Sequence, residues 1–252
     1  MFKWKVCPIQ GRQLKDVNPE DIIGDFRICK TYKSGGGYDQ FPIIAKNRNM
    51  IKPNMLGGAD KQFVVQLQGC HLRCPYCYVT RDGIYGVTKD YTSSELVSQF
   101  YKSVKEHDTG VLHLMGGAPA LYLSHWPEIL DLLEDDVLFH SDLMLTEHEY
   151  TIPELLAIAR DNALYAVNIK GVSDTDYFEN TGKNIDWEMF WRNLTLLRMT
   201  RVNFYLTFTA PDPFTLPIFK EQLVKRYGED ILNDSFIIHL KQYEAIKDGP
   251  AW

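Results

Sequence analysis

Between residues 63 and 240, short apolar runs alternate with stretches of helical periodicity, and this alternation constrains the fold more than any other feature of the chain. Each run has the length of a buried strand, and the stretches between the runs are long enough for crossover helices. Strands that alternate with helices in this way form a parallel sheet, because the chain must cross one face of the sheet before it adds the next strand. The predicted fold class is therefore α/β.

The predicted elements of this region are six strands and five helices. The strands are expected at Phe63–Leu67, Val111–Met115, Asp142–Leu145, Leu164–Ile169, Val202–Phe208 and Ser235–Leu240. The helices are expected at Ser93–Glu106, His125–Leu133, Ile152–Arg160, Asp186–Met199 and Leu216–Tyr227. Right-handed crossovers curl such a sheet in one direction, and six units are too few to close an eight-stranded barrel. We therefore expect an open, partial (βα)6 TIM-like barrel over residues 62–252.

Residues 1–61 lack this alternation, and we interpret them as an N-terminal extension. The extension carries 11 Lys and Arg against 6 Asp and Glu, whereas the rest of the chain carries 16 against 27. A basic segment of this kind either folds back on the acidic body or contacts an acidic or phosphate-bearing partner. An open barrel leaves a lateral gap and an exposed edge. The extension is long enough to cover one of them or to shape the substrate opening.

The chain has no run of eighteen apolar residues, so no membrane span is expected. Its first residues lack the apolar segment and small-residue cleavage site of a signal peptide. Five cysteines, three of them crowded into eight residues, do not suit a secreted disulfide framework. We therefore expect a cytoplasmic protein with neither a membrane nor a nucleic acid as its partner.

The three crowded cysteines are Cys70, Cys74 and Cys77, in the spacing Cys-x3-Cys-x2-Cys. Thiolates are the usual ligands of iron–sulfur clusters, and three of them leave the fourth iron of a cubane cluster open. The alternatives are a zinc site or three buried thiols without metal. Structural zinc needs four ligands. Here the fourth would have to be Cys7 or Cys29, each more than forty residues away.

The spacing, with the aromatic Tyr76 directly before the last cysteine, resembles the signature of the radical S-adenosylmethionine (SAM) superfamily. The run from Phe63 to Cys70 further resembles the strand entering the cluster loop in glycyl-radical-enzyme activating enzymes and in 7-carboxy-7-deazaguanine synthase. The resemblance covers residues 62–241. It implies a [4Fe–4S] cluster on the three cysteines, SAM bound at the open iron, and Tyr76 against the adenine.

The same resemblance implies SAM-binding roles for residues that follow the second and third predicted strands. Gly116 and Gly117 stand where the family carries Gly-Gly-Glu-Pro, and their missing side chains let backbone groups approach the methionine moiety. The chain departs from this pattern because Ala118 replaces the glutamate. Thr146 and Glu147 stand where polar residues approach the ribose or the methionine. An ordinary strand-to-helix turn and a helix N-cap are the alternative interpretations.

Two further strand ends complete the predicted cofactor site. Asn168 and Lys170 resemble the Asp-x-Lys strand end of the activating enzymes, and Lys170 is expected to pair with the SAM carboxylate. His239 suits a contact to the ribose or the substrate. A solvated lysine and a histidine satisfied within the core are the alternatives.

The function implied is reductive cleavage of SAM to a 5′-deoxyadenosyl radical that abstracts a hydrogen atom from a substrate. The first candidate is activation of a glycyl-radical enzyme. The alternatives are radical modification of a small molecule, nucleoside or peptide, and a non-catalytic iron–sulfur binding protein. Such an oxidoreductase requires a low-potential electron donor of the flavodoxin or ferredoxin type, and its substrate is not identified by the sequence.

Overall fold

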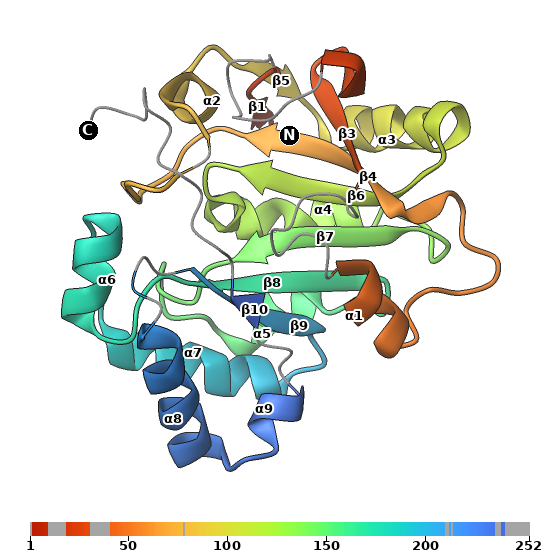
Figure 1. Ribbon diagram of the computed structural model, residues 1–252. Coiled ribbons are helices and arrows are strands. Elements are labelled where there is room, and N and C mark those ends of the chain that lie inside the picture. The colour runs from red at the N-terminus through yellow and green to blue at the C-terminus, as the bar shows by residue number, and fades with distance from the viewer. Residues whose placement is uncertain are drawn as a thin grey trace.

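The computed structural model describes residues 2–9, 19–30, 41–77, 79–209, 212, 214–234 and 238–239. These residues form one sheet in which six neighbouring strands run parallel, in the order β4–β6–β7–β8–β9–β10 (Figure 1). The six strands are β4 (Gly58–Leu67), β6 (Thr109–Gly116), β7 (Leu138–Leu143), β8 (Ala163–Ile169), β9 (Phe204–Phe208) and β10 (Ile238–His239). The sequence predicted this α/β class and partial TIM-like barrel, and both are confirmed.

Helices cover the outer face of the sheet, and the main apolar core lies between them and the strands (Figure 1). They are α3 (Ser93–His107), α4 (Trp126–Leu130), α5 (Ile152–Ile158), α7 (Trp187–Met199) and α8 (Thr215–Tyr227). Shorter helical segments are α2 (Arg81–Tyr85), α6 (Asp174–Thr181), α9 (Ile231–Asp234) and the 3-10 helices Pro19–Asp21 and Pro119–His125. No helix in the described part of the chain is long and apolar enough to cross a bilayer.

The inner face of the sheet carries polar side chains and is partly covered by α1 (Phe41–Asn47) (Figure 1). Ile44 of this helix packs with Leu164 and Tyr205 of the inner face. Next to this apolar cluster, His140 Nε2 lies 3.0 Å from the Tyr205 hydroxyl, and both side chains are buried. Hydrogen bonds between buried polar groups offset the free-energy cost of burying them, so the inner face of the sheet can carry polar side chains.

Helix positions agree with the predictions, and local signals explain why. Thr92 and Glu95 form a reciprocal capping box at the start of α3, which therefore begins at the predicted residue. The third strand is displaced, because β7 ends at Leu143 whereas the prediction ran from Asp142 to Leu145. His140 and Asp142 interrupt the apolar run in the sequence, although both belong to β7. Of the sixth predicted strand, residues 235–237 and 240 lie outside the described residues.

The N-terminal region adds strands to the free edge of β4. The strand β1 (Trp4–Val6) pairs antiparallel with the end of β4 and with β5 (Lys89–Tyr91). The strand β3 (Phe26–Lys30) pairs antiparallel with the middle of β4 and also with β2 (Ile22–Ile23). The edge of β4 is thus paired rather than exposed. The division of the chain at residue 61 stays a prediction, since this pairing continues the sheet across it.

Candidate active site

One pocket at the carboxyl end of the parallel strands collects most of the residues predicted from the sequence. It spans about 710 Å³, part of which is open to solvent, and it is formed by the loops after β4 and β6, by residues of β7 and β8 and by the segments that follow β7, β8 and β9. The lining residues are Cys70, Leu72, Cys74, Tyr76, Cys77, Val79, Gly116, Gly117, Ala118, Pro119, Asp142, Met144, Asn168, Lys170 and Thr209. Barrel enzymes of this architecture carry their active sites at this end of the strands.

The cysteine loop leaves β4 through Gly69, whose φ of +90° is a conformation that side chains rarely adopt. Its backbone is held from two sides. Gly69 N donates to Ile84 O at 2.8 Å, and Arg73 N donates to Thr181 O at 2.7 Å. The loop is therefore fixed both by the segment that follows it and by the distant end of α6.

Burial keeps the three thiols protonated in the free protein. It raises the pKa of Cys70 to about 12 and that of Cys77 to about 11, and it also raises the pKa of Cys74. The ammonium of Lys170 acts in the opposite direction on all three. Metal ligation requires thiolates, so metal binding here displaces protons and supplies the positive charge that the pocket lacks.

The number of thiols in the pocket bears on whether they suit a single ion or a cluster. Among the described residues, no three His, Cys, Asp or Glu side chains are grouped so that they share one metal ion. A structural zinc ion needs four ligands around one centre. A cubane cluster instead places each thiolate on a different iron, which suits three thiols spread around one pocket. The donor set therefore fits a cluster with one open iron.

The Gly-Gly loop after β6 packs directly on the cysteine loop. Ala118 N donates to Gly69 O at 2.7 Å, and a Cβ atom on Gly117 would overlap that same oxygen. A Cβ atom on Gly116, whose φ is +110°, would come within 2.6 Å of Gln66 Cγ. Because these two residues are glycines, the end of β6 can pack directly against the cysteine loop. The small side chain of Ala118 lines the pocket.

The opposite side of the pocket carries polar groups from β7 and β8. Thr207 Oγ1 donates to Asn168 Oδ1 at 2.8 Å, and Asn168 in turn hydrogen-bonds to Asp142. Burial raises the pKa of Asp142 to about 6, although Lys170 and Asn168 favour its ionised form. The sequence interpretation missed Asp142 because it placed this residue at the start of a strand. The alternation Leu138, His140, Asp142 was the signal that could have placed it on the inner face.

Tyr76 lies where a planar ring could contact a ligand, and its contacts fix its orientation. Its hydroxyl donates to Thr209 O at 3.2 Å, and Lys170 Nζ lies 5.8 Å from the centre of its ring. Tyr76 is buried and lines the pocket. Thr209, which follows β9, was also missed, because no motif marks that strand end.

Thr146 and Glu147 are placed beside the pocket and bind neighbouring segments. Glu147 Oε2 lies 2.6 Å from His71 Nε2 and 3.5 Å from Lys183 Nζ, and Thr146 Oγ1 lies 2.7 Å from the Tyr177 hydroxyl. Burial alone would raise the pKa of Glu147, but His71 and Lys183 hold it below its usual value. These contacts tie the loop after β7 to the cysteine loop. A cofactor-binding role for either residue stays a prediction.

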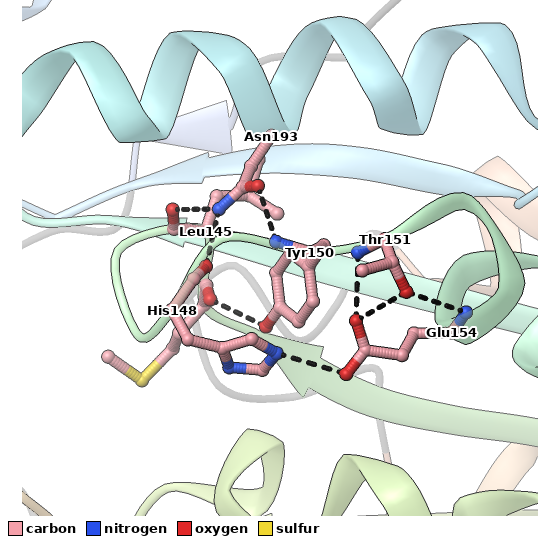
Figure 2. A network of polar contacts seen from close by, with 7 residues as sticks. Leu145, His148, Tyr150, Thr151, Glu154 and Asn193 are labelled. Carbon is pink, nitrogen blue, oxygen red and sulfur yellow. Dashed lines mark hydrogen bonds and ion pairs between the residues drawn. The ribbon is translucent and has the colours of Figure 1, made fainter.

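The loop after β7 is itself held by Asn193 of α7, as Figure 2 shows. Asn193 Nδ2 donates to Leu145 O at 2.9 Å and to His148 O at 2.7 Å, and Asn193 Oδ1 accepts from Tyr150 N at 2.9 Å. The Tyr150 hydroxyl donates to Met144 O at 2.8 Å. One buried amide therefore fixes the loop that supplies both a pocket residue and Glu147.

His239 ends β10 and pairs in register with Phe208 of β9. Its backbone therefore lies at the carboxyl edge of the sheet, on the same edge as the cysteine loop. Its predicted contact to ribose or substrate stays a prediction.

Comparison with known proteins identifies the family of the chain. A family model of the radical SAM superfamily matches residues 64–212, which is more than half of the chain. The chain therefore belongs to the radical SAM superfamily of enzymes. No curated protein matches the chain by sequence.

Several solved structures are similar to this chain at low sequence identity. SuiB of Streptococcus suis, bound to its precursor peptide SuiA, is 10% identical and matches with a TM-score of 0.52 over 82% of this chain and 46% of its own. The structure of anSMEcpe with AdoMet and a Cp18Cys peptide is 16% identical, with a TM-score of 0.47 over 73% and 50%. Methylornithine synthase PylB is 12% identical, with a TM-score of 0.45 over 82% and 60%. The chain spans about half the length of these proteins.

Proposed function

We propose that this chain binds a [4Fe–4S] cluster through Cys70, Cys74 and Cys77, and that it uses SAM at the open iron to abstract a hydrogen atom from a substrate. The observation that supports this most is that the three thiols, the Gly-Gly loop and Lys170 line one pocket. When bound, the reduced cluster supplies the electron that cleaves SAM to methionine and a 5′-deoxyadenosyl radical.

The residues of this chain bind SAM, orient it and exclude water from the pocket. Lys170 carries the positive charge that a SAM carboxylate needs, and its position near the thiols suits a ligand held at the open iron. Backbone groups of Gly116 and Gly117 are reachable because no side chain covers them. Tyr76 offers a buried ring for the adenine. The apolar lining residues Leu72, Val79 and Met144 keep bulk water from a radical intermediate.

Two classes of substrate remain candidates. The Asn-x-Lys strand end supports a glycyl-radical-enzyme activase, which would abstract hydrogen from a glycine backbone. Ala118 in place of the family glutamate and the N-terminal strands on β4 favour divergence toward a small molecule, nucleoside or peptide. In either case the enzyme requires a low-potential flavodoxin or ferredoxin. The clustered cysteines make the cytoplasm the proposed location.

The test is anaerobic reconstitution of the full chain, followed by reduction in the presence of SAM. We expect about four irons per chain. Mass spectrometry should detect 5′-deoxyadenosine and methionine, and deuterium should pass from the true substrate into 5′-deoxyadenosine. Stoichiometric zinc without iron in protein purified without oxygen would contradict the proposal.

The matched control is Cys29→Ala, because Cys29 lies on β3 and is not one of the pocket-lining residues. This variant should keep the iron content and the cleavage of SAM. Loss of iron in Cys29→Ala would mean that the ligands are wrongly assigned.

A further inference from the structure

Asp142 is a half-buried carboxylate that lines the pocket from β7. It lies on β7, opposite Ala166 of β8, and it is the acidic member among the described residues that line the pocket. The register of β6 with β7 pairs Leu114 with Ser141, and Asp142 is the next residue along β7. Asp142 and the three thiols therefore line the same pocket, Asp142 from β7 and the thiols from the loop after β4.

The charge of Asp142 is incompletely compensated in the free protein. The cost of burial exceeds the help from Lys170 and Asn168, because the pKa of Asp142 is raised to about 6 despite both groups. Lys170 also acts on all three thiols. Lys170 is the one cationic side chain among the described residues that line the pocket, so a ligand that brings a positive charge would complete the compensation of an ionised Asp142.

The chemistry of bound SAM indicates which cation this is. A metal ligand donates a lone pair and must be deprotonated, so a SAM amino group that chelates iron is a neutral amine. The SAM carboxylate is likewise engaged at the iron and with Lys170. The positive charge that remains on the cofactor is the sulfonium, which neither S-adenosylhomocysteine nor the cleavage products carry.

Resting on the proposed function, we propose that Asp142 is the counter-ion of the SAM sulfonium and that it selects the intact cofactor over its neutral thioether analogue. A carboxylate in a pocket of low dielectric attracts a nearby cation far more strongly than it would in water. It has no such attraction for methionine or 5′-deoxyadenosine after cleavage, which favours their release.

A second consequence concerns the stability of the free protein. A carboxyl group whose folded-state pKa is raised binds its proton more tightly in the folded state, so stability increases as pH falls through about 6 towards 3.8. Above pH 6 the ionised Asp142 opposes folding. The other groups facing it are Lys170, Asn168 and Tyr205, and burial keeps the Tyr205 phenol neutral by raising its pKa. Asp142→Asn should therefore melt at a higher temperature than wild type at pH 8, and this difference should shrink at pH 5.

The decisive experiment measures binding to the oxidised holoprotein, in which SAM is not cleaved. SAM and S-adenosylhomocysteine are titrated calorimetrically into wild type, Asp142→Asn and Asp142→Glu at equal iron content. We expect Asp142→Asn to lose roughly tenfold or more in affinity for SAM and about twofold or less for S-adenosylhomocysteine. Asp142→Glu should retain part of the preference. The control Asp131→Asn, an exposed partner of Arg160, should change neither affinity.

Equal losses for both ligands would overturn the proposal, since Asp142 would then contact the nucleoside or the amino-acid moiety. Unchanged affinities would overturn it as well. If Asp142→Asn does not hold a cluster, Asp142→Ser takes its place in the same titrations. Failure of the wild-type holoprotein to bind SAM would instead contradict the proposed function itself.

Discussion

The pocket has two walls that are built differently. The cysteine wall, residues 69–77, is one loop whose thiols are neutral until metal displaces their protons. The charged wall consists of Asp142 and Asn168, which lie on the paired strands β7 and β8, and of Lys170, which directly follows β8. The cysteine wall supplies ligands by their spacing in the sequence, whereas the charged wall supplies charges by the pairing of strands. Mutations in the cysteine wall should therefore change metal binding, and mutations in the charged wall should change cofactor selection, each without the other.

The largest expected effect removes a ligand from the cysteine wall. Cys74→Ala leaves two thiolates, and we expect it to abolish stable iron binding because a cubane cluster would lose a second iron ligand. Iron analysis and absorbance of anaerobically reconstituted protein measure this. If this variant kept about four irons, residues of the charged wall would have to help hold the cluster. The two walls would then not differ in function as described above.

The next largest effect is expected from a variant that changes the shape of the cysteine wall and leaves its three thiols in place. Gly117→Ala forces a methyl group onto Gly69 O, and overpacking of this kind costs roughly 1–3 kcal/mol of unfolding free energy. Because the clash displaces the cysteine loop, iron retention against a chelator should fall. Gly24→Ala is the control: its φ of +59° makes alanine costly, yet no atom lies within 4 Å of the new Cβ. It should lower the urea midpoint without loss of iron.

A smaller effect belongs to the charged wall. Lys170→Ala should weaken SAM binding by roughly tenfold to a hundredfold, as expected for a lost charge-assisted hydrogen bond. Iron content should change little, because the thiolates remain. Equilibrium binding to the oxidised holoprotein provides the measurement, with the exposed Lys102→Ala as the control. Unchanged affinity would assign Lys170 a structural role only.

The smallest effect is expected at Ala118, where the family carries a glutamate. Ala118→Glu should preserve SAM binding or tighten it by roughly fivefold at most, because a carboxylate beside a chelating amine gains one hydrogen bond rather than a full ion pair. Calorimetry of the holoprotein resolves a change of this size. A large loss would show that another group already fills the space beside this buried side chain.

The cysteine wall was predictable because its information is local. Three thiols within eight residues, the strand before them and the Gly-Gly turn can all be read without knowing the fold. Strands and helices with a regular apolar period were also placed well, since burial of one face dictates that period. The edge strands β1 and β3 were not predicted, because three and five residues are too few for an alternation of apolar and polar side chains to stand out.

The rest of the site depends on contacts between distant residues. Asp142 gains its role from the register of β7 between β6 and β8, which no local pattern specifies. The placement of Glu147 depends on Asn193, which lies on α7 and fixes the preceding loop. His71 then meets Glu147 across that loop. A resemblance can name such positions, but only the assembled fold shows which neighbours they contact.

The hydrogen bond from Arg73 to the Thr181 carbonyl has a consequence for synthesis of the chain. When the third cysteine leaves the ribosome, the partner that fixes its loop is still about a hundred residues from being made. At ordinary elongation rates this interval lasts roughly 5–20 s. During that time the three thiols are unshielded and open to oxidants and to competing ions such as zinc. Delivery of the proposed cluster is therefore expected after synthesis of α6, and a nascent chain stalled before that point should accept iron poorly.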